Sequence, residues 1–343
     1  MTEKKYDTLV YIGRFQPVHN AHIETIRRAT LLARQVVVIV GSANLPRTYK
    51  NPFTAKERAA MLQNSFGGLG DRETAIKIEF NTDTMYNDNA WAIRVQALVK
   101  KHTYGRGTVG IIGHDKDEST FYLKMFPQWA REDVELIEPL NATEVRDLYF
   151  REDYNANFLR GVVPAATKDF LEYFRNTPEY AQIIREREFI AEHNKQYAGL
   201  KYPPIFVTAD AVVIQSGHVL LIKRRAEPGK GLWALPGGYV NANTDKSVED
   251  AAIRELREET KIKVPDPVLR GSIVRSRVFD AVNRSPRGRI ITHAFYIQLP
   301  DGELPKVKGS DDAEKARWVP IAEVLSEECF EDHFEIIQHF LGA

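Results

Sequence analysis

The chain has 343 residues, of which 43% are hydrophobic, so it is long enough for two ordinary globular domains. Its 47 basic and 47 acidic residues balance, which argues against a protein that coats nucleic acid or binds a membrane surface. The single cysteine, Cys329, excludes an intrachain disulfide, and the lack of a long apolar run or an apolar signal core predicts a cytoplasmic protein.

Short β-branched runs alternate with helical patterns through the first half of the chain. The predicted strands are Thr8–Ile12, Val36–Val40, Ile76–Phe80 and Val109–Ile112. The predicted helices are 21–34, Ala55–Ser65 with Thr54 as its N-cap, and Trp91–Lys101. Strands that alternate with helices predict an α/β domain built on a doubly wound parallel sheet.

The chain changes character between Thr167 and Tyr197, where it is helical and rich in charge, with Pro178 as a candidate break. Pro203-Pro204 then ends the helical pattern. We therefore expect a first domain over residues 1–185, a helical linker over 186–204 and a second domain over 205–343.

The second half is rich in strands. The predicted strands are Ile205–Ile214, Val219–Ile222, Ile273–Phe279 and Ile290–Gln298, the first two joined by a turn at Gly217-His218. The predicted helices are Ser247–Lys261 and 331–341. A mixed sheet with few helices predicts an α+β domain.

The strand at Thr8–Ile12 is followed by Gly13-Arg14-Phe15-Gln16-Pro17-Val18-His19-Asn20-Ala21-His22. Gly13 lets a phosphate approach the backbone closely, and the start of the next helix offers free N–H groups. His19 and His22 share one helix face, where imidazolium groups would neutralise charge on a pentacoordinate phosphorus. Surface histidines or a chance zinc pair would explain His-x-x-His alone, but the Gly-Arg-Phe context after a strand favours a phosphate site.

This segment resembles the signature of the nucleotidylyltransferase superfamily, and it is most similar to that of the nicotinamide mononucleotide (NMN) adenylyltransferases. The second signature of those enzymes, Ser-x-Thr-x-x-Arg, resembles residues 141–146, where Thr143 and Arg146 match and Asn141 replaces serine. Asparagine can still cap a helix and donate to a phosphate oxygen. The resemblance implies a Rossmann-like first domain.

Three further segments resemble the same family. Arg47 and the run 51–58, Asn-Pro-Phe-Thr-Ala-Lys-Glu-Arg, are similar to its substrate-side loop and helix. Trp91, which follows Asp88, offers an indole that would stack on nicotinamide, although core packing explains a tryptophan equally well. Lys116 lies in Gly-His-Asp-Lys-Asp at a strand end, where open α/β sheets bind ligands.

The resemblance implies transfer of AMP from ATP to NMN, which yields NAD and pyrophosphate without a covalent enzyme intermediate. It assigns His19 and His22 to the ATP phosphates and the transition state, and Arg146 and Thr143 to the ATP phosphates. Mg²⁺ would bridge oxygen atoms of ATP. The remaining residues that it implies for substrate and ATP binding are Gly13, Arg14, Phe15, Arg47, Asp88, Trp91, Lys116 and Asn141.

A second signature runs from Leu235-Pro236-Gly237-Gly238 to Arg254-Glu255-Leu256-Arg257-Glu258-Glu259-Thr260. Glu255, Glu258 and Glu259 lie on one helix face, where like charges repel, and a divalent cation is the natural reason to gather them. Arg254, four residues before Glu258, can orient it. A solvated charged face is the usual interpretation of such a helix, but the Pro-Gly-Gly turn upstream argues for a site.

This pattern resembles the Nudix box, with Gly237, Gly238 and Arg254 on the substrate side and Glu255, Glu258 and Glu259 as ligands of Mg²⁺ or Mn²⁺. Two departures stand out. The loop before Arg254 is two residues too long, which puts Lys246 at the first glutamate position, although a short register shift would let Asp245 replace it. The late glycine is Lys261, which bears on helix termination more than on metal binding.

The whole chain looks like the fusions of an NMN adenylyltransferase with an ADP-ribose pyrophosphatase. The resemblance implies ADP-ribose as the second substrate, hydrolysed to AMP and ribose 5-phosphate. Five arginines between Arg275 and Arg289 would contact phosphate or ribose, or form an exposed basic loop with equal chance. We expect nucleotides such as ATP, NMN, NAD and ADP-ribose as partners, no nucleic acid and no membrane, and we leave a homo-oligomer open.

Three alternatives stay open at this point. The first domain would otherwise be a cytidylyltransferase or a pantetheine-phosphate adenylyltransferase, which lack the Asn-Pro-Phe-Thr-Ala-x-Glu-Arg segment. The second would otherwise be a ligand-sensing module without catalysis, to which Lys246 and Lys261 lend weight, or a Nudix site for another nucleoside diphosphate derivative.

Overall fold

The computed structural model describes residues 4–67, 74–114, 118–134, 141–310 and 312–342. The chain divides into two compact units, Met1–Ile184 and Arg185–Ala343. In the described ranges, no helix is long and apolar enough to cross a membrane.

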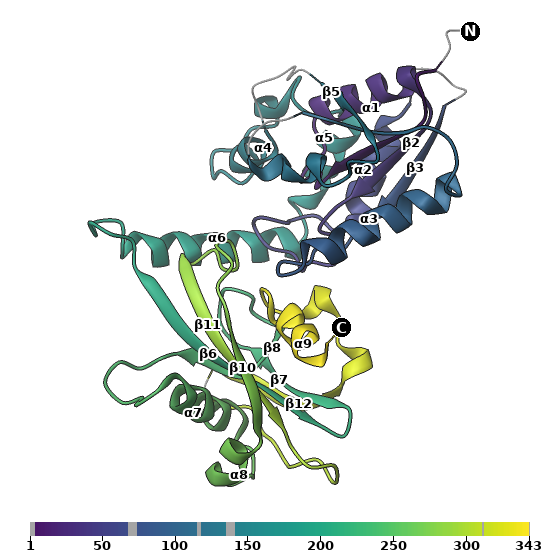
Figure 1. The fold of residues 1–343 in the computed structure, drawn as a ribbon. Helices are drawn as coiled ribbons and strands as arrows, with labels where there is room; N and C mark the ends of the chain where they lie inside the picture. Colours follow the sequence, from purple (N-terminus) through teal and green to yellow (C-terminus); the bar gives the residue numbers. More distant parts are fainter. Residues whose placement is uncertain (1–3, 68–73, 115–117, 135–140, 311, 343) are drawn as a thin grey trace. The chain divides into compact units, whose positions relative to one another are not determined.

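The first unit is built on a five-stranded sheet in the order β3-β2-β1-β4-β5, in which every neighbouring pair is parallel (Figure 1). Its strands are β1 (Tyr6–Gly13), β2 (Ala33–Val40), β3 (Ala75–Phe80), β4 (Val109–Gly113) and β5 (Ala130–Asp133). Its helices are α1 (Asn20–Leu32), α2 (Ala55–Ser65), α3 (Asp88–Thr103), α4 (Ala142–Tyr149) and α5 (Ala165–Phe174), with short 3₁₀ helices η1 (Glu118–Lys124) and η2 (Ala156–Leu159). The predicted doubly wound parallel sheet is confirmed.

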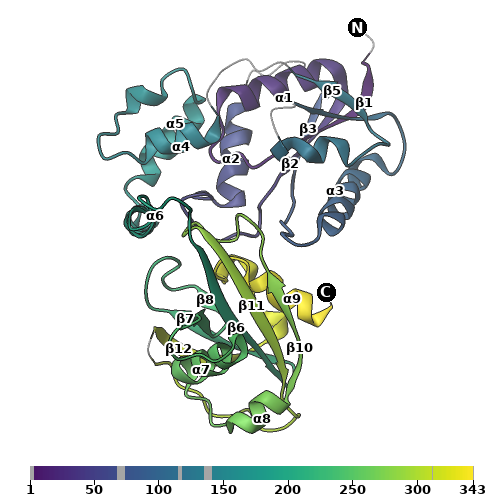
Figure 2. The same cartoon turned by 60° about the vertical axis from the view of Figure 1, so that its left-hand side comes forward.

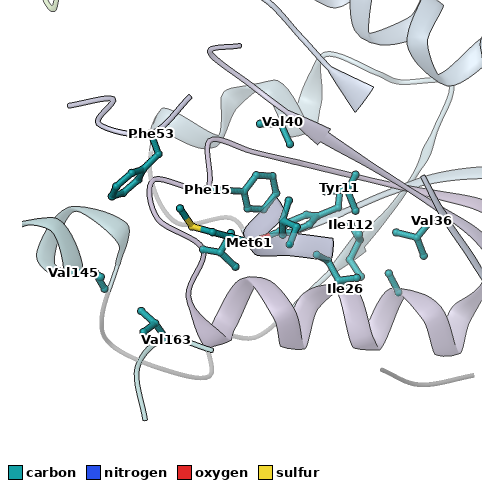
Figure 3. Packing of buried hydrophobic residues seen from close by; sticks show 14 of the residues in the cluster. Tyr11, Phe15, Ile26, Val36, Val40, Phe53, Met61, Ile112, Val145 and Val163 are labelled. Carbon is teal, nitrogen blue, oxygen red and sulfur yellow. The ribbon is translucent and has the colours of Figure 1, made fainter. Parts of the chain in front are cut away.

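Alternate residues of the central strands enter two hydrophobic clusters, one on each face of this sheet. Tyr11 of β1 packs on one face with Ile26 of α1 and Met61 of α2 (Figure 3). Val10 packs on the other face with Val95 of α3. Each fully buried side chain of this kind contributes roughly 1.5–3 kcal/mol. Because helices cover both faces, a ligand has access at the carboxyl ends of the strands, where the chain order reverses beside β1.

The helix expected over residues 21–34 ends two residues early. α1 stops at Leu32, and Ala33 already belongs to β2, where it pairs with Tyr6 of β1. Ala33 is fully buried, so its packing in the sheet outweighs the helical pattern, which alone would extend the helix over this residue.

A single helix, α6 (Pro178–Lys195), begins in the first unit and ends in the second. The break expected at Pro178 is confirmed: α5 ends at Phe174, and this proline opens the next helix, where its missing N–H costs no hydrogen bond. Farther along, the buried carboxylate of Glu186 accepts a hydrogen bond from the N–H of Gly229, at 3.3 Å. The segment expected as a linker, 186–204, is therefore helical as far as Lys195 and is counted within the second unit.

The second unit holds a seven-stranded mixed sheet in the order β10-β11-β6-β7-β12, with β8 paired to β7 and β9 to β6. Its strands are β6 (Ile205–Gln215), β7 (His218–Arg224), β8 (Trp233–Ala234), β9 (Gly237–Tyr239), β10 (Ile273–Phe279), β11 (Arg289–Gln298) and β12 (Ala313–Pro320). Its helices are α7 (Val248–Thr260), α8 (Asp266–Gly271) and α9 (His333–Leu341), with η3 (Ile321–Glu323) and η4 (Ser326–Glu328). β11 runs parallel to β6, whereas β10 and β7 are antiparallel to their neighbours, so the predicted α+β fold is confirmed.

Helices lie on both sides of this sheet as well (Figures 1 and 2). Ala211 of β6 packs on one side with Ile253 and Leu256 of α7. On the other side, the ring of Phe340 in α9 stacks on Tyr296 of β11, with the centroids 5.7 Å apart. α7, which carries the second signature, is thus fixed by its apolar face, and its carboxylates share a cavity with Asp210 in the middle of β6.

Candidate functional sites

The first signature loop leaves the carboxyl end of β1 in a conformation that needs glycine. Phe15 has a left-handed φ of 55° and is 1% exposed, so its ring is folded back under the loop. A Cβ atom on Gly13 would lie 2.8 Å from that ring. Phe15 packs edge-on against Tyr11, at 5.6 Å between centroids, as Figure 3 shows. The buried ring therefore anchors the loop, and Gly13 makes room for it.

The two histidines meet at the start of α1. His19 is the N-cap, and its ring stacks on that of His22 with the centroids 3.6 Å apart. The N–H of His19 donates to Nδ1 of His22 at 3.2 Å, which leaves Nε2 of His22 as a donor. Burial, followed by the charge of His19, lowers the pKa of His22 well below its ordinary value. This hydrogen bond and the lowered pKa favour a neutral His22 that offers an N–H, and the imidazolium role expected for the pair against phosphate stays a prediction.

Two buried polar side chains hold this loop against the rest of the rim. Gln16 exchanges two hydrogen bonds with the backbone of Phe53, at 2.9 and 3.1 Å. Arg58 of α2 is 1% exposed and donates to three carbonyl groups at the strand ends. These belong to Arg14 at 2.6 Å, Gly41 at 2.7 Å and Ser42 at 3.0 Å. Arg58 is part of the run matched in the sequence, but its role in holding the rim was not predicted.

Three cations gather above the same rim. Burial, then Arg14, lowers the pKa of Lys50, and the same two causes lower the pKa of Arg146 to about 10. Arg146 donates to the carbonyl of Gln16 at 2.7 Å and to Thr143 Oγ1 at 3.1 Å. Its buried Nε has no hydrogen-bond partner among the described residues. Cations gathered this closely are suited to bind an anion. Sequence reasoning missed Lys50, whose one signal was its place directly before Asn-Pro-Phe-Thr.

Asn141 begins α4 as expected of an N-cap. Its side chain accepts hydrogen bonds from the N–H groups of Thr143 and Glu144, at 2.9 and 3.1 Å, and Glu144 bonds back to the N–H of Asn141. Asparagine thus performs the capping that the family's serine would perform, and α4 presents Arg146 to the rim.

The other residues expected near the substrate have structural partners or lie farther out. Arg47 forms a two-pronged ion pair with Glu57, at 2.7 Å for each bond, and so supports the capping box of α2. Trp91 packs on the second core cluster, 6.1 Å from the ring of Tyr122, which favours the packing interpretation. Asp88 is in the first turn of α3, which begins three residues earlier than expected. Lys116 lies outside the described residues.

In the second unit, Arg254 stands at the centre of the α7 signature. Its Nη1 donates to Glu255 Oε1 at 2.8 Å and to Glu258 Oε2 at 2.9 Å, and its Nη2 to the carbonyl of Tyr239 at 3.2 Å. Its remaining donors bond both carboxylate oxygens of Asp245, at 2.8 and 2.9 Å. Asp245, rather than Lys246, therefore takes part in the box, as the register shift considered above requires.

The Pro-Gly-Gly turn lets the backbone approach the carboxylates. Gly237 N–H donates to Glu259 Oε2 at 2.9 Å. A Cβ atom on Gly237 would lie 2.2 Å from Asp210 Oδ1, and one on Gly238 would lie 2.5 Å from Glu255 Oε1. Burial raises the pKa of Glu259 to about 8. The hydrogen bond from Gly237 opposes this rise, whereas the charges of Glu255 and Asp210 add to it. These three acidic groups form a crowded pocket of negative charge.

A cavity of about 570 Å³ lies beside this turn. Its charged lining includes Asp210, Arg224, Glu255, Glu259, Arg287 and Glu331. Its aromatic lining includes Phe189, His193, Tyr239 and Phe330. The Glu258 side chain is 42% exposed and is not part of the lining. Within the described ranges, no three acidic, histidine or cysteine side chains are already arranged to hold a metal ion. Lys261 ends α7 with a left-handed φ of 49°, so lysine occupies the cap where the family has glycine.

The arginine-rich stretch divides into two groups. Arg284 forms a buried ion pair with Asp332, at 2.7 Å and 2.9 Å, and Arg287 faces Glu331 at 3.3 Å; both arginines line the cavity. Arg275 bonds a carbonyl of α9 and Arg277 bonds His339. The expected basic contact surface is thus limited to two of the five arginines, together with Arg224, which was not predicted.

Comparisons with known proteins agree with this division. A cytidylyltransferase-like family matches residues 10–202 and a NUDIX domain matches residues 204–340. The nicotinamide/nicotinic acid mononucleotide adenylyltransferase of Acinetobacter baylyi is 40% identical over 181 residues, 52% of this chain and 92% of that protein. The ADP-ribose pyrophosphatase of Methanocaldococcus jannaschii is 33% identical over 160 residues, 47% of this chain and 83% of that protein.

A solved structure covers both units. It is a bifunctional NMN adenylyltransferase/ADP ribose pyrophosphatase from Francisella tularensis, complexed with AMP and a Mn ion. It is 31% identical, covers 98% of this chain and 99% of its own, and has a TM-score of 0.90. The chain therefore belongs to the cytidylyltransferase-like family and, over nearly its whole length, to the bifunctional NMN adenylyltransferase/ADP-ribose pyrophosphatases.

Proposed function

We propose that the first unit joins NMN to the AMP part of ATP, with release of pyrophosphate, and that the second hydrolyses ADP-ribose to AMP and ribose 5-phosphate. The observation that carries this proposal is the opposite chemistry of two sites in separate units. One is a cluster of three cations, of which Arg146 is buried, with a histidine pair at the ends of a parallel sheet. The other is a group of buried carboxylates beside a cavity.

In the first unit, a phosphate oxygen of NMN would attack the α-phosphorus of ATP, and the bond to the β-phosphate would break. Arg14, Lys50 and Arg146 would balance the charge of the phosphates, and Nε2–H of His22 would donate to an oxygen of the transferred phosphate. The backbone N–H of His19 holds His22 in that orientation, and the His19 ring, stacked on that of His22, would contact the same phosphates. Preorganised donors of this kind favour the transition state because they need not reorganise during the reaction.

In the second unit, a water oxygen would attack one phosphorus of ADP-ribose, and the bridging P–O bond would break. Glu255 and Glu259, with Glu258 at the open end of the helix face, would hold the divalent cation. The raised pKa of buried Glu259 beside Glu255 supports this, because a cation would relieve the repulsion between them. When bound, the cation supplies an activated water and balances the charge of the diphosphate. Arg254 keeps Glu255 and Glu258 in place.

Several finer points remain predictions from the sequence. These are Mg²⁺ as the ion used, with Mn²⁺ as a substitute, and a cytoplasmic location, whereas the sequence leaves a homo-oligomer open. ATP, NMN, NAD and ADP-ribose are the small-molecule partners that the proposal requires, and the balanced charge of the chain argues against nucleic acid.

A ligand-sensing second unit is the main alternative. This alternative was supported by Lys246 and Lys261, which depart from the Nudix box, and the structure weakens the argument from each of them. Asp245 bonds Arg254 in place of the missing glutamate, and Lys261 still forms the left-handed cap of α7. With the arginine-centred carboxylate network in place, hydrolysis is the better supported function.

The test uses two variants of the full chain, each expected to lose one activity and keep the other. NAD formation from NMN and ATP, and AMP release from ADP-ribose with Mg²⁺ or Mn²⁺, are measured for the wild type, His19→Ala and Glu259→Gln. We expect His19→Ala to abolish only NAD formation and Glu259→Gln to abolish only hydrolysis. Loss of both activities in either folded variant would contradict two independent sites, and a wild type that does not cleave ADP-ribose would favour the sensing module.

A further inference from the structure

The lining of the cavity of the second unit combines two kinds of side chain. Asp210, Glu255 and Glu259 gather around the Gly237-Gly238 turn, where a cation and a diphosphate would bind. Phe189, His193 and Tyr239 line the same cavity without adding a carboxylate. A nucleoside diphosphate sugar has a matching division, because its charged diphosphate is joined through ribose to a flat, weakly polar base.

Two of these aromatic residues come from α6, ahead of the segment that matches the NUDIX domain. The helix is held in place at two points of the second unit. Glu186, which is 3% exposed, accepts the N–H of Gly229 at 3.3 Å, and Asn194 donates to the carbonyl of Pro286 at 3.2 Å. Phe189 and His193 are three and seven residues after Glu186, so a regular helix carries all three on one face.

The aromatic rings continue from α6 onto the sheet. The His193 ring lies 5.9 Å from that of Phe206 in β6, and Phe206 lies 5.8 Å from Tyr239 in β9, in tilted or edge-on arrangements. Phe189 and Tyr239 nonetheless stay 41% and 40% exposed. Core residues of this size would be covered, so two half-exposed rings on one cavity wall are available to a ligand.

Taking the proposed hydrolase function as its basis, we propose that the adenine ring of the substrate stacks on this wall, and that Phe189 of α6 is a specificity-determining contact for the base. A purine presents a π-face that an aromatic ring can stack on, whereas the distal ribose of ADP-ribose has none. The base-recognition surface of the hydrolase is therefore completed by the helix that precedes its catalytic domain. Arg287, whose guanidinium lies 5.9 Å from the Tyr239 ring, closes the side of the wall toward the phosphates.

The test uses full-length Phe189→Ala, with Phe189→Tyr as the conservative variant and Glu192→Ala as an exposed control on the same helix. Steady-state hydrolysis is measured with ADP-ribose and with CDP-ribose, whose smaller base stacks less, and AMP is used as an inhibitor of the reaction. We expect Phe189→Ala to raise KM for ADP-ribose and the AMP inhibition constant by at least about fivefold, to leave kcat nearly unchanged, and to reduce the preference over CDP-ribose. Phe189→Tyr should restore all three values.

Each other outcome has a definite meaning. Unchanged KM and AMP inhibition in Phe189→Ala would overturn the inference while leaving the hydrolase assignment intact. A loss of kcat toward both substrates, with no change in preference, would also overturn it, because it would indicate a structural role. A wild type without hydrolysis would instead defeat the proposed function, and thermal unfolding followed by circular dichroism reports whether the second unit of each variant is folded.

Discussion

Asp245 and Arg254 form a two-pronged ion pair that closes the long loop before α7, with Nε–Oδ1 and Nη2–Oδ2 distances of 2.8 and 2.9 Å. The hydrogen bonds from Arg254 lower the pKa of Asp245, so this carboxylate stays charged. The same guanidinium holds Glu255 and Glu258. A residue outside the standard spacing thus positions the two carboxylates through their shared arginine.

We therefore predict that Asp245→Ala lowers kcat for ADP-ribose hydrolysis about 10- to 100-fold, the range found when residues that orient metal ligands are removed. Asp245→Glu should retain most of the activity, and Lys246→Ala should have no effect because Lys246 carries no part of the network. Rates at saturating metal and substrate test this. A loss of activity in Lys246→Ala equal to that in Asp245→Ala would show that the loop as a whole, rather than this ion pair, is responsible.

Replacing Gly237 and replacing Gly238 of β9 by alanine should have different effects. A Cβ on Gly237 meets the backbone oxygen of Ala209 at 2.5 Å, which cannot move easily, so Gly237→Ala should destabilise the second unit by about 1–3 kcal/mol. A Cβ on Gly238 meets the end of the Glu255 side chain, which can rotate. Gly238→Ala should therefore fold normally and lose hydrolysis.

Chemical unfolding and hydrolysis rates separate these two outcomes. Gly271→Ala is the matched control, because a Cβ there meets nothing within 4 Å. Normal hydrolysis by Gly238→Ala would mean that Glu255 is free to adopt another position without cost, and would argue against it as a fixed ligand of the cation.

Periodicity predicted most of the fold, because each strand and helix is decided largely by its own residues. β1, β2 and α2 follow directly from short apolar runs and from the Thr54 cap. The break at Pro178 also follows from the sequence, but Ala33 leaves α1 because it is buried in the sheet, and α6 is held in the second unit by contacts such as that of Glu186 with Gly229. Such contacts join residues far apart in the chain, and no local pattern encodes them.

Local sequence patterns were limited in the same way in predicting the two sites. The box pattern identified Arg254 and the three glutamates, but it could not tell that Glu258 lies outside the cavity lining or that Asp245 replaces Lys246, because both depend on how the chain packs around α7. Lys50 was missed because nothing about a lysine before Asn-Pro-Phe-Thr predicts that it will lie close enough to Arg14 and Arg146 for their charges to lower its pKa. Residue type and spacing indicate a chemistry, whereas burial and partners decide which residues take part.

Acidification should destabilise the second unit through His333. Its Nδ1 accepts the N–H of Leu235 at 2.9 Å, and burial lowers its pKa to about 3. Asp332 favours the charged ring, but nearby cations oppose it; these are Arg284, Arg224 and Arg287. Unfolded histidine takes up a proton near pH 6.5, whereas the folded residue does so only near pH 3, so the unfolded state binds more protons in between. The stability from this group is complete above pH 6.5 and decreases as the pH falls toward 3.

Hydrogen exchange of peptides from β6 and β11, measured at pH 7.5 and 5.5 and corrected for intrinsic rates, tests this prediction. His333→Gln, whose amide oxygen can still accept the N–H of Leu235, should lose less protection on acidification than the wild type. His218→Gln at the β6–β7 turn should behave like the wild type. An identical loss of protection in the wild type and His333→Gln would mean that other groups cause the acid sensitivity.

Lys50 should contribute to NAD formation through its charge. It shares the rim with Arg14 and Arg146, which lower its pKa after burial, so removing it takes one cation from a site built for phosphates. A hydrogen bond to a charged group is worth about 1.5–3 kcal/mol, which predicts a 10- to 150-fold loss of kcat/KM in Lys50→Ala. Lys50→Arg should recover much of this loss because it restores the charge.

Lys56→Ala, which removes an exposed cation from α2, should leave the rate unchanged. Initial rates with ATP and NMN varied in turn would assign the loss to one substrate. An equal effect of Lys50→Ala and Lys56→Ala would indicate long-range attraction of the nucleotides by net charge, in which case raising the salt concentration should remove the difference from wild type.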